Sequence, residues 1–206
     1  MVGTLLTRGM LIGLLAALLS FAFLKTVGEP AVDRAIAFET QMDEAKAKAK
    51  RDEATARGMP MPAEEQDYEV VSRPVQTGVG LLTGVTVYSI AFGGLFALAF
   101  ALAYRRMGPF GARATSALLA LSGIVAVYVV PNLKYPANPP SVGDPETIKI
   151  RTALYFSMIA ISLAAMIAAW MIRNRLVPRY GEWDASLIAA SAYLIAVVLV
   201  SLALPA

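Results

Sequence analysis

The 206-residue sequence contains no histidine and no cysteine. Without cysteine the chain forms no disulfide and no thiolate metal site. Without histidine it lacks the commonest transition-metal ligand and the usual proton carrier near neutral pH. Selective binding of a transition metal is therefore not expected from this chain alone.

The sequence also lacks a recognisable catalytic constellation. It contains no phosphate-binding loop of the G-x-x-x-x-G-K type and no cofactor motif, and no residue is placed to activate a serine or carboxylate as a nucleophile. We therefore expect a protein that is not an enzyme and needs no cofactor. The net charge of +3 is scattered along the edges of apolar runs, so binding to nucleic acid is not expected.

Charged residues are scarce within the long apolar runs. The chain is 57% hydrophobic and only 16% charged, and apolar runs of about 18 residues or more predict membrane spans. Such spans must be helical, because the bilayer offers no water to unpaired backbone groups. The predicted fold is an all-α integral membrane protein, a single membrane domain over residues 1–206 with five transmembrane helices in the lipid bilayer. The predicted spans are roughly 4–24, 76–103, 114–133, 152–172 and 185–205.

Short loops rich in arginine predict the orientation of these spans. Arginines near membrane spans stay in the cytoplasm, and short loops weigh most in this rule. We therefore predict a multi-pass protein of the bacterial cytoplasmic (inner) membrane, with the N-terminus in the cytoplasm and the C-terminus outside. The first span has no small-residue cleavage site and is expected to stay uncleaved. The residues that decide the orientation are Arg8, Arg105, Arg106, Arg113, Arg173, Arg175 and Arg179.

Residues 25–74 are predicted to form an extramembrane loop that contains a polar helix. Pro30 is a helix-start signal, and the stretch 43–53 favours a helix that has no apolar stripe to bury. Glu29 and Asp33 would lie on one face of this helix, near the outer membrane surface. Two interpretations remain open: the pair is an entry site for a hard cation, or it is negative charge that stabilises a helix N-terminus.

Residues 131–151 are predicted to form a proline-rich cap outside the membrane. Four prolines between 131 and 140 exclude a continuous helix there. Lys134 is expected either to extend its ammonium group toward the interface or to pair with Glu29 or Asp144. If the chain handles a polar solute or ion, we expect its path at the following residues: Glu29, Asp33, Asn132, Lys134, Tyr135, Asn138 and Asp144.

Glycines spaced four apart predict close packing of the first two spans. Gly9 and Gly13 form such a step in the first span, and Gly80 and Gly84 form one in the second. Small residues at this spacing let two membrane helices approach closely.

Three separated motifs resemble CbtA, a membrane family of predicted cobalt transporter subunits. They are VGEPAVDRAIAFE at 27–39, VQTGVGLLTGVTVYSIAFGGLFAL at 75–98 and NLKYPANPPSVGDPETIKIRTALYF at 132–156. The resemblance covers nearly the whole chain and implies a membrane component of a divalent metal (cobalt-type) uptake system. It also implies a small single-span, histidine-bearing partner subunit that captures the metal. Members of the family often continue toward a further span, so this sequence is expected to be a shorter variant.

A second hypothesis comes from another class of protein. The absence of charge at the centre of the spans and the glycine faces are typical of an accessory or structural subunit that packs against a larger membrane complex. The two hypotheses differ in the expected partner. A transporter should be found with a small metal-binding protein, whereas an accessory subunit should be found in a large assembly.

Overall fold

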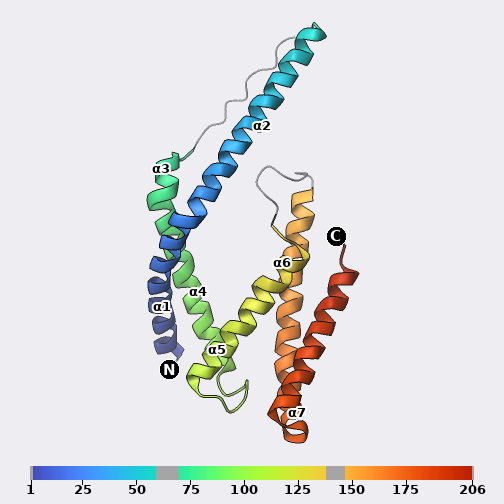
Figure 1. Ribbon diagram of the computed structural model, residues 1–206. Helices are drawn as coiled ribbons and strands as arrows, with labels where there is room; N and C mark the ends of the chain where they lie inside the picture. Colours follow the sequence, from blue (N-terminus) through green and yellow to red (C-terminus); the bar gives the residue numbers. More distant parts are fainter. Residues whose placement is uncertain (1, 59–69, 138–146, 206) are drawn as a thin grey trace. The chain divides into compact units, whose positions relative to one another are not determined.

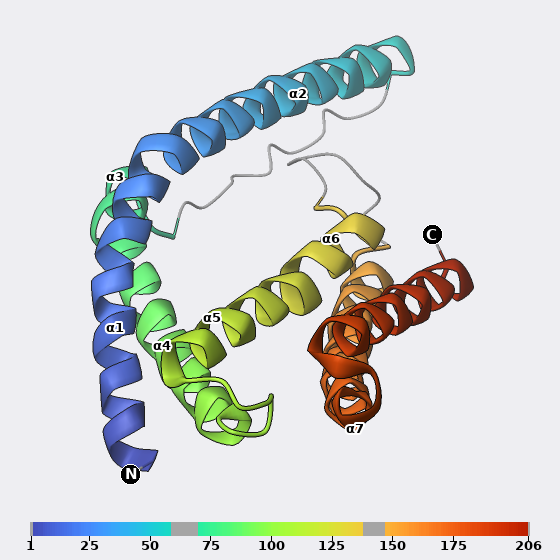
Figure 2. The same ribbon diagram turned by 60° about the horizontal axis from the view of Figure 1, so that its bottom comes forward.

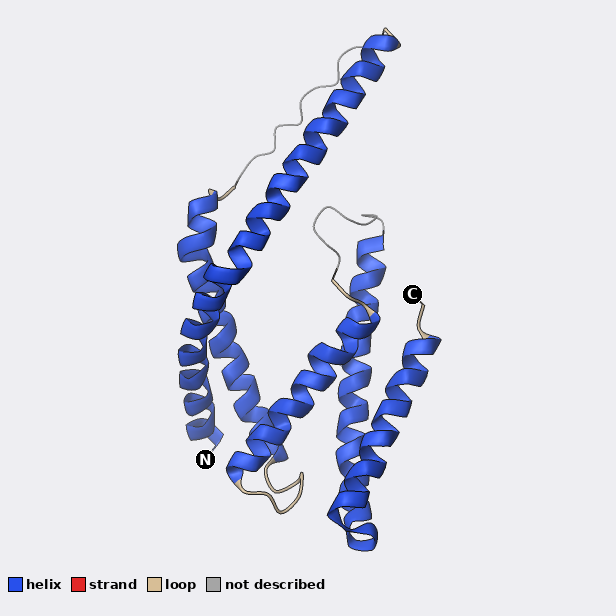
Figure 3. Cartoon of the chain, in the orientation of Figure 1, coloured by secondary structure: helices blue, strands red, loops and turns tan. Residues whose placement is uncertain are grey.

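The computed structural model describes residues 2–58, 70–137 and 147–205, and these residues form helices and connecting loops without strands (Figure 3). Four of the described helices are long and apolar enough to cross a membrane, namely Val2–Ala56, Arg73–Ala103, Ala112–Lys134 and Ile148–Ala203. Large apolar side chains point outward along them, as expected where lipid surrounds the helices. Leu19, Leu133 and Leu202 are each more than three-quarters exposed. The chain is therefore an all-helical, multi-pass membrane protein, as the apolar runs predict.

The helices belong to two compact units. Among the described residues, the first unit holds residues 2–58 and 70–98, and the second holds residues 99–137 and 147–205. The helix α4 (Leu81–Ala103) begins in the first unit, and its residues from Ala99 onward belong to the second.

The first unit contains two long helices that are each continuous through a wide π-helical turn. One consists of α1 (Val2–Phe23), the turn η1 (Leu24–Gly28) and α2 (Glu29–Ala56). The other consists of α3 (Arg73–Val75), the turn η2 (Gln76–Gly80) and α4 (Figure 1). Pro30 is the second residue of α2 and lies within the continuous helix Val2–Ala56, and α2 is solvent-exposed along nearly its whole length. The predicted loop 25–74 thus begins as a direct helical continuation of the first span.

The second unit contains α5 (Ala112–Gly123), the π-helical turn η3 (Ile124–Val129), α6 (Val130–Lys134) and α7 (Ile148–Ala203). Gly181 lies within α7 with φ of 76° and ψ of 172°, values outside the helical region. The chain reverses there, so that residues 148–180 and 182–203 form two arms that lie side by side in both views (Figures 1 and 2). Buried residues of α6, of the position after it and of both arms form the core of this unit: Val130, Tyr135, Met158, Ala169, Tyr193 and Val197.

The first residues of the predicted cap, 131–134, are helical. Pro131 is buried within α6, which continues to Lys134. Pro131 is the second residue after η3, and the Val130 N–H bonds to the Val125 carbonyl five residues back. The helix Ala112–Lys134 therefore departs from α-helical hydrogen bonding just before the proline, which has no N–H to donate. At the other end of the cap, α7 begins at Ile148, so residues 148–151 are helical as well.

Candidate functional site

Two acidic residues at the start of α2 bind one arginine at the start of α3. Arg73 Nη2 lies 2.6 Å from Glu29 Oε2 and 2.7 Å from Asp33 Oδ1, and Arg73 Nε lies 3.1 Å from the same Asp33 oxygen. The Glu29 side chain is 14% exposed and that of Asp33 is 60% exposed. One guanidinium offsets one of the two carboxylate charges, so the cluster keeps a net negative charge. We call these three residues the acidic clamp.

The acidic clamp also joins the two long helices of the first unit at one end. Arg73 follows Asp33 by 40 residues in the chain. A second contact lies at the same end, where Lys25 Nζ donates to the Thr77 carbonyl at 2.9 Å. These contacts place the sequence-predicted pair Glu29 and Asp33 between α2 and α3, so both interpretations of the pair must include Arg73.

Two residues of the predicted path hold the end of α7. Lys134 Nζ donates to the Leu204 carbonyl at 3.1 Å, and the Tyr135 hydroxyl donates to the Pro205 carbonyl at 2.7 Å. The last carbonyls of a helix have no partner within the helix, and a cation there interacts favourably with the helix dipole. Lys134 therefore caps α7, a role that neither sequence interpretation included.

A third residue of the predicted path, Asn132, lies at a cavity of about 350 Å³ in the second unit. Its amide nitrogen donates to the Tyr128 carbonyl at 2.9 Å and to the Tyr155 hydroxyl at 3.2 Å. Tyr135 and Thr152 also line this cavity, and so does the positively charged Arg151. Because the amide nitrogen makes both hydrogen bonds, the carbonyl oxygen of Asn132 is the group left to contact a solute. We call this the outer cavity. The other predicted path residues, Asn138 and Asp144, lie outside the described residues.

The sequence analysis missed a polar contact between the two arms of α7. The Ser162 and Tyr193 hydroxyl oxygens lie 2.8 Å apart, and both residues are buried. Single hydroxyls in an apolar run carry no sequence signal of their partner, because the contact depends on the reversal at Gly181. The hydrogen bond satisfies both groups where no water is available.

Glycines bring α1 and α4 into close contact. A Cβ atom on Gly9 would overlap the Gly93 carbonyl, and one on Gly13 would overlap the Ser89 carbonyl. The predicted second glycine pair does not take part in this contact. A Cβ on Gly84 would meet no described atom within 4 Å, and one on Gly80 would meet only Val75 of its own helix. The packing of α1 on α4 thus depends on Gly9, Gly13 and Gly93.

The metal-ligand chemistry of the described residues is limited. No group of three or more acidic side chains comes together among residues 2–58, 70–137 and 147–205. The oxygen donors that the structure brings together are the two carboxylates of the acidic clamp and the neutral oxygens of the outer cavity. Such donors suit a passing divalent cation better than they suit selection among transition metals.

Comparison with known proteins gives one match. The family described as "Probable cobalt transporter subunit (CbtA)" matches residues 2–206. No curated protein and no solved structure matches the chain. The match confirms the resemblance that the three sequence motifs indicate, and it covers both structural units. The chain therefore belongs to the CbtA family of probable cobalt transporter subunits.

Proposed function

We propose that this chain is the membrane-embedded passage of a divalent metal uptake system, and that a different protein of the system captures the metal. The observation that carries the proposal is the family match over residues 2–206, which makes the chain a probable cobalt transporter subunit. The composition is the reason for assigning capture of the metal and its passage to different proteins. A chain without histidine and cysteine offers only oxygen and thioether ligands, whereas cobalt is held best by a site that includes nitrogen or sulfur.

The proposed capture protein is the small single-span, histidine-bearing partner that the family resemblance implies. We expect purification from native membranes in mild detergent to recover the chain with such a partner and with bound cobalt in the same peak. Mass spectrometry and metal analysis of that peak provide the measurement. Recovery in a large assembly without metal would contradict the proposal and would favour an accessory role instead.

We propose five spans for the chain, with the reversal of α7 at Gly181 dividing it into two. Each arm of α7 contains one of the predicted apolar runs, 152–172 and 185–205. Two groups of arginines support the predicted orientation, one near Arg106 and one near Arg173, because both groups lie at the same end of the second unit. Asn174 Nδ2 donates to the Arg106 carbonyl, which joins the two segments that carry them. In this orientation the outer cavity, α2 and the C-terminus lie outside. To test it, Lys50 in α2 is replaced by a single cysteine, and we expect a membrane-impermeant thiol reagent to modify that cysteine in intact cells.

For the ion itself we propose a route that starts at the acidic clamp and the outer cavity. The net negative charge of Glu29, Asp33 and Arg73 attracts cations, and the Asn132 carbonyl oxygen offers a neutral ligand. Lys134 and Tyr135 fix the end of α7 beside the outer cavity. Asn138 and Asp144 are proposed to contribute further oxygen donors to the same route.

The outer cavity gives the sharpest test of this route. We expect Asn132→Leu, which keeps the approximate side-chain volume but removes the amide, to lower cobalt uptake several-fold in cells or proteoliposomes. Tyr155→Phe should lower uptake less, because it removes only the acceptor of one Asn132 hydrogen bond. Tyr128→Phe is the matched control, since this tyrosine lies in the same unit with its side chain mostly exposed. Unchanged uptake in Asn132→Leu, at equal protein level in the membrane, would refute the route.

A further inference from the structure

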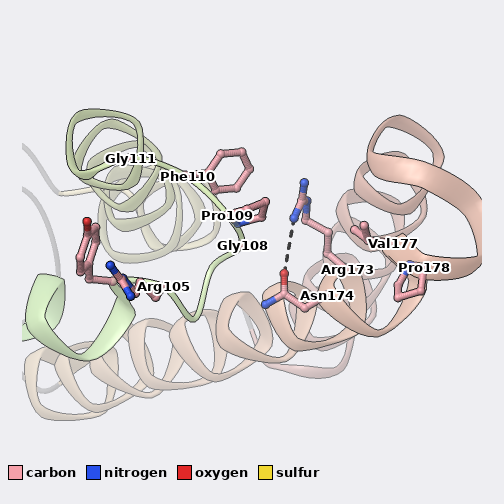
Figure 4. A pocket seen from close by; sticks show the side chains of 10 residues that line it. Arg105, Gly108, Pro109, Phe110, Gly111, Arg173, Asn174, Val177 and Pro178 are labelled. Carbon is pink, nitrogen blue, oxygen red and sulfur yellow. Dashed lines mark hydrogen bonds between the residues drawn. The ribbon is translucent and has the colours of Figure 1, made fainter.

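A second cavity lies at the opposite end of the second unit. It measures about 620 Å³, within the range typical of small-molecule sites, and is lined by the loop after α4 and by the first arm of α7 (Figure 4). Among the described residues, its charged lining residues are two arginines, Arg105 and Arg173, and no carboxylate lines it. We call this the basic cavity.

Arg173 is a buried charge that no described carboxylate neutralises. Only 6% of the residue is exposed. Its Nε donates to Ser186 Oγ at 2.9 Å, and its Nη1 lies 3.4 Å from Asn174 Oδ1 and 3.5 Å from the Met107 carbonyl. These three acceptors are neutral. Burial of an ionised group is costly unless a counter-charge accompanies it, so the site favours an anion.

Two aromatic rings lie against this guanidinium. The Arg173 guanidinium carbon lies 5.2 Å from the centre of the Phe110 ring and 5.6 Å from that of the Trp170 ring. Stacked faces hold the group in place and direct further binding to its N–H donors. Among the described residues, Nη2 has no hydrogen-bond partner, whereas Nε and Nη1 have theirs.

The loop after α4 lies close to the Arg173 guanidinium. Gly108 has φ of 134°, and a Cβ atom there would meet the Phe110 ring at 2.9 Å and Arg173 Nη1 at 3.2 Å. Arg105 has φ of 63°, a conformation that a residue with a side chain adopts at some cost in free energy. Strain of this kind is concentrated at ligand sites, and here it lies beside the cavity that Arg105 lines.

We propose that the basic cavity binds a phosphate group, carried by an anionic phospholipid or by a soluble phosphate compound. Arginine presents N–H donors in a planar fork that matches phosphate oxygens, and both arginines that line this cavity can donate charge-assisted hydrogen bonds. The cavity lies at the end of membrane-spanning helices, where phospholipid head groups are found. This inference is independent of the metal route, because none of its residues belongs to the acidic clamp or the outer cavity.

The test uses the full-length protein in nanodiscs and in detergent. Thermal unfolding in nanodiscs with phosphatidylglycerol is compared with that in pure phosphatidylcholine, and inorganic pyrophosphate is titrated into the detergent-purified protein. We expect one of these phosphates to stabilise the protein, and Arg105→Gln to weaken its binding by about tenfold, the size of one charge-assisted contact. Arg175→Gln is the matched control, because this arginine lies between the lining residues Asn174 and Val177 but is exposed and does not itself line the cavity.

Each outcome distinguishes a specific phosphate-binding site from general attraction between basic residues and anions. Stabilisation by phosphatidylglycerol alone would identify a lipid site, and stabilisation by pyrophosphate would identify a site for soluble phosphates. Arg173→Lys keeps the charge but loses the planar fork, so it should weaken binding as well. Equal loss of binding in Arg105→Gln and Arg175→Gln, or no stabilisation by either phosphate, would overturn the proposal.

Discussion

Gly13→Ala is expected to destabilise the first unit, whereas Gly84→Ala is expected to leave its stability unchanged or to raise it. The new methyl group at Gly13 would overlap the backbone carbonyl of Ser89, which no rotamer change can relieve. Overpacking of this kind costs about 1–3 kcal/mol. Gly84 has no described atom within 4 Å of an added Cβ, and alanine is favoured over glycine within a helix by about 0.5–1 kcal/mol. The two variants make the same chemical change in the same unit, and only Gly13→Ala is expected to lower its stability.

Cross-linking measures this effect at the contact itself. The chain has no cysteine, so an introduced pair reacts without background. Met10→Cys with Gly94→Cys is a suitable pair, because a Cβ on Gly94 lies 3.4 Å from Met10 Cγ. Addition of Gly13→Ala to this pair should lower the yield of the disulfide, and addition of Gly84→Ala should not. Equal yields, together with equal unfolding temperatures, would show that α1 does not pack on α4 through Gly13.

The sequence predicts the helices well and their partners poorly. Long uncharged runs predict membrane helices because the bilayer excludes unpaired backbone groups, a rule that needs no knowledge of the neighbours. The four-residue glycine spacing likewise identifies faces suited to close packing, but it does not say which faces meet. Gly93, which contacts Gly9, belongs to no such pair in the predicted set. Neither Gly80 nor Gly84 is the partner of α1.

Contacts between residues far apart in sequence explain what else the sequence analysis missed. Arg73 pairs with Asp33 at a separation of 40 residues, and Lys134 binds the Leu204 carbonyl at a separation of 70. Local spacing indicates that Glu29 and Asp33 share a helix face, yet it cannot reveal the cation opposite them. Local sequence also does not reveal that the helix Ala112–Lys134 includes Pro131, which comes just after the wide turn η3.

Arg73→Gln is expected to lower the stability of the first unit, and the added change Glu29→Gln is expected to restore part of it. The Glu29 side chain is only 14% exposed, so loss of the guanidinium leaves a largely buried carboxylate without its counter-charge. Glutamine at position 29 removes that charge. Thermal unfolding of the wild type, both single variants and the double variant gives a double-mutant cycle. Its coupling free energy measures the interaction between Glu29 and Arg73. Asp33 is more exposed, so Asp33→Asn should couple to Arg73→Gln more weakly.

The same variants distinguish the two interpretations of the acidic pair. If Glu29 and Asp33 receive the incoming ion, Arg73→Gln frees both carboxylates, and cobalt ions should raise the unfolding temperature of this variant more than that of the wild type. The effect should disappear in the double variant with Glu29→Gln, because one carboxylate is gone. Identical responses to cobalt in all four proteins would leave the acidic clamp as a structural tie between α2 and α3. The ion route would then have to begin at the outer cavity, where Asn132 and Tyr155 provide its oxygen atoms.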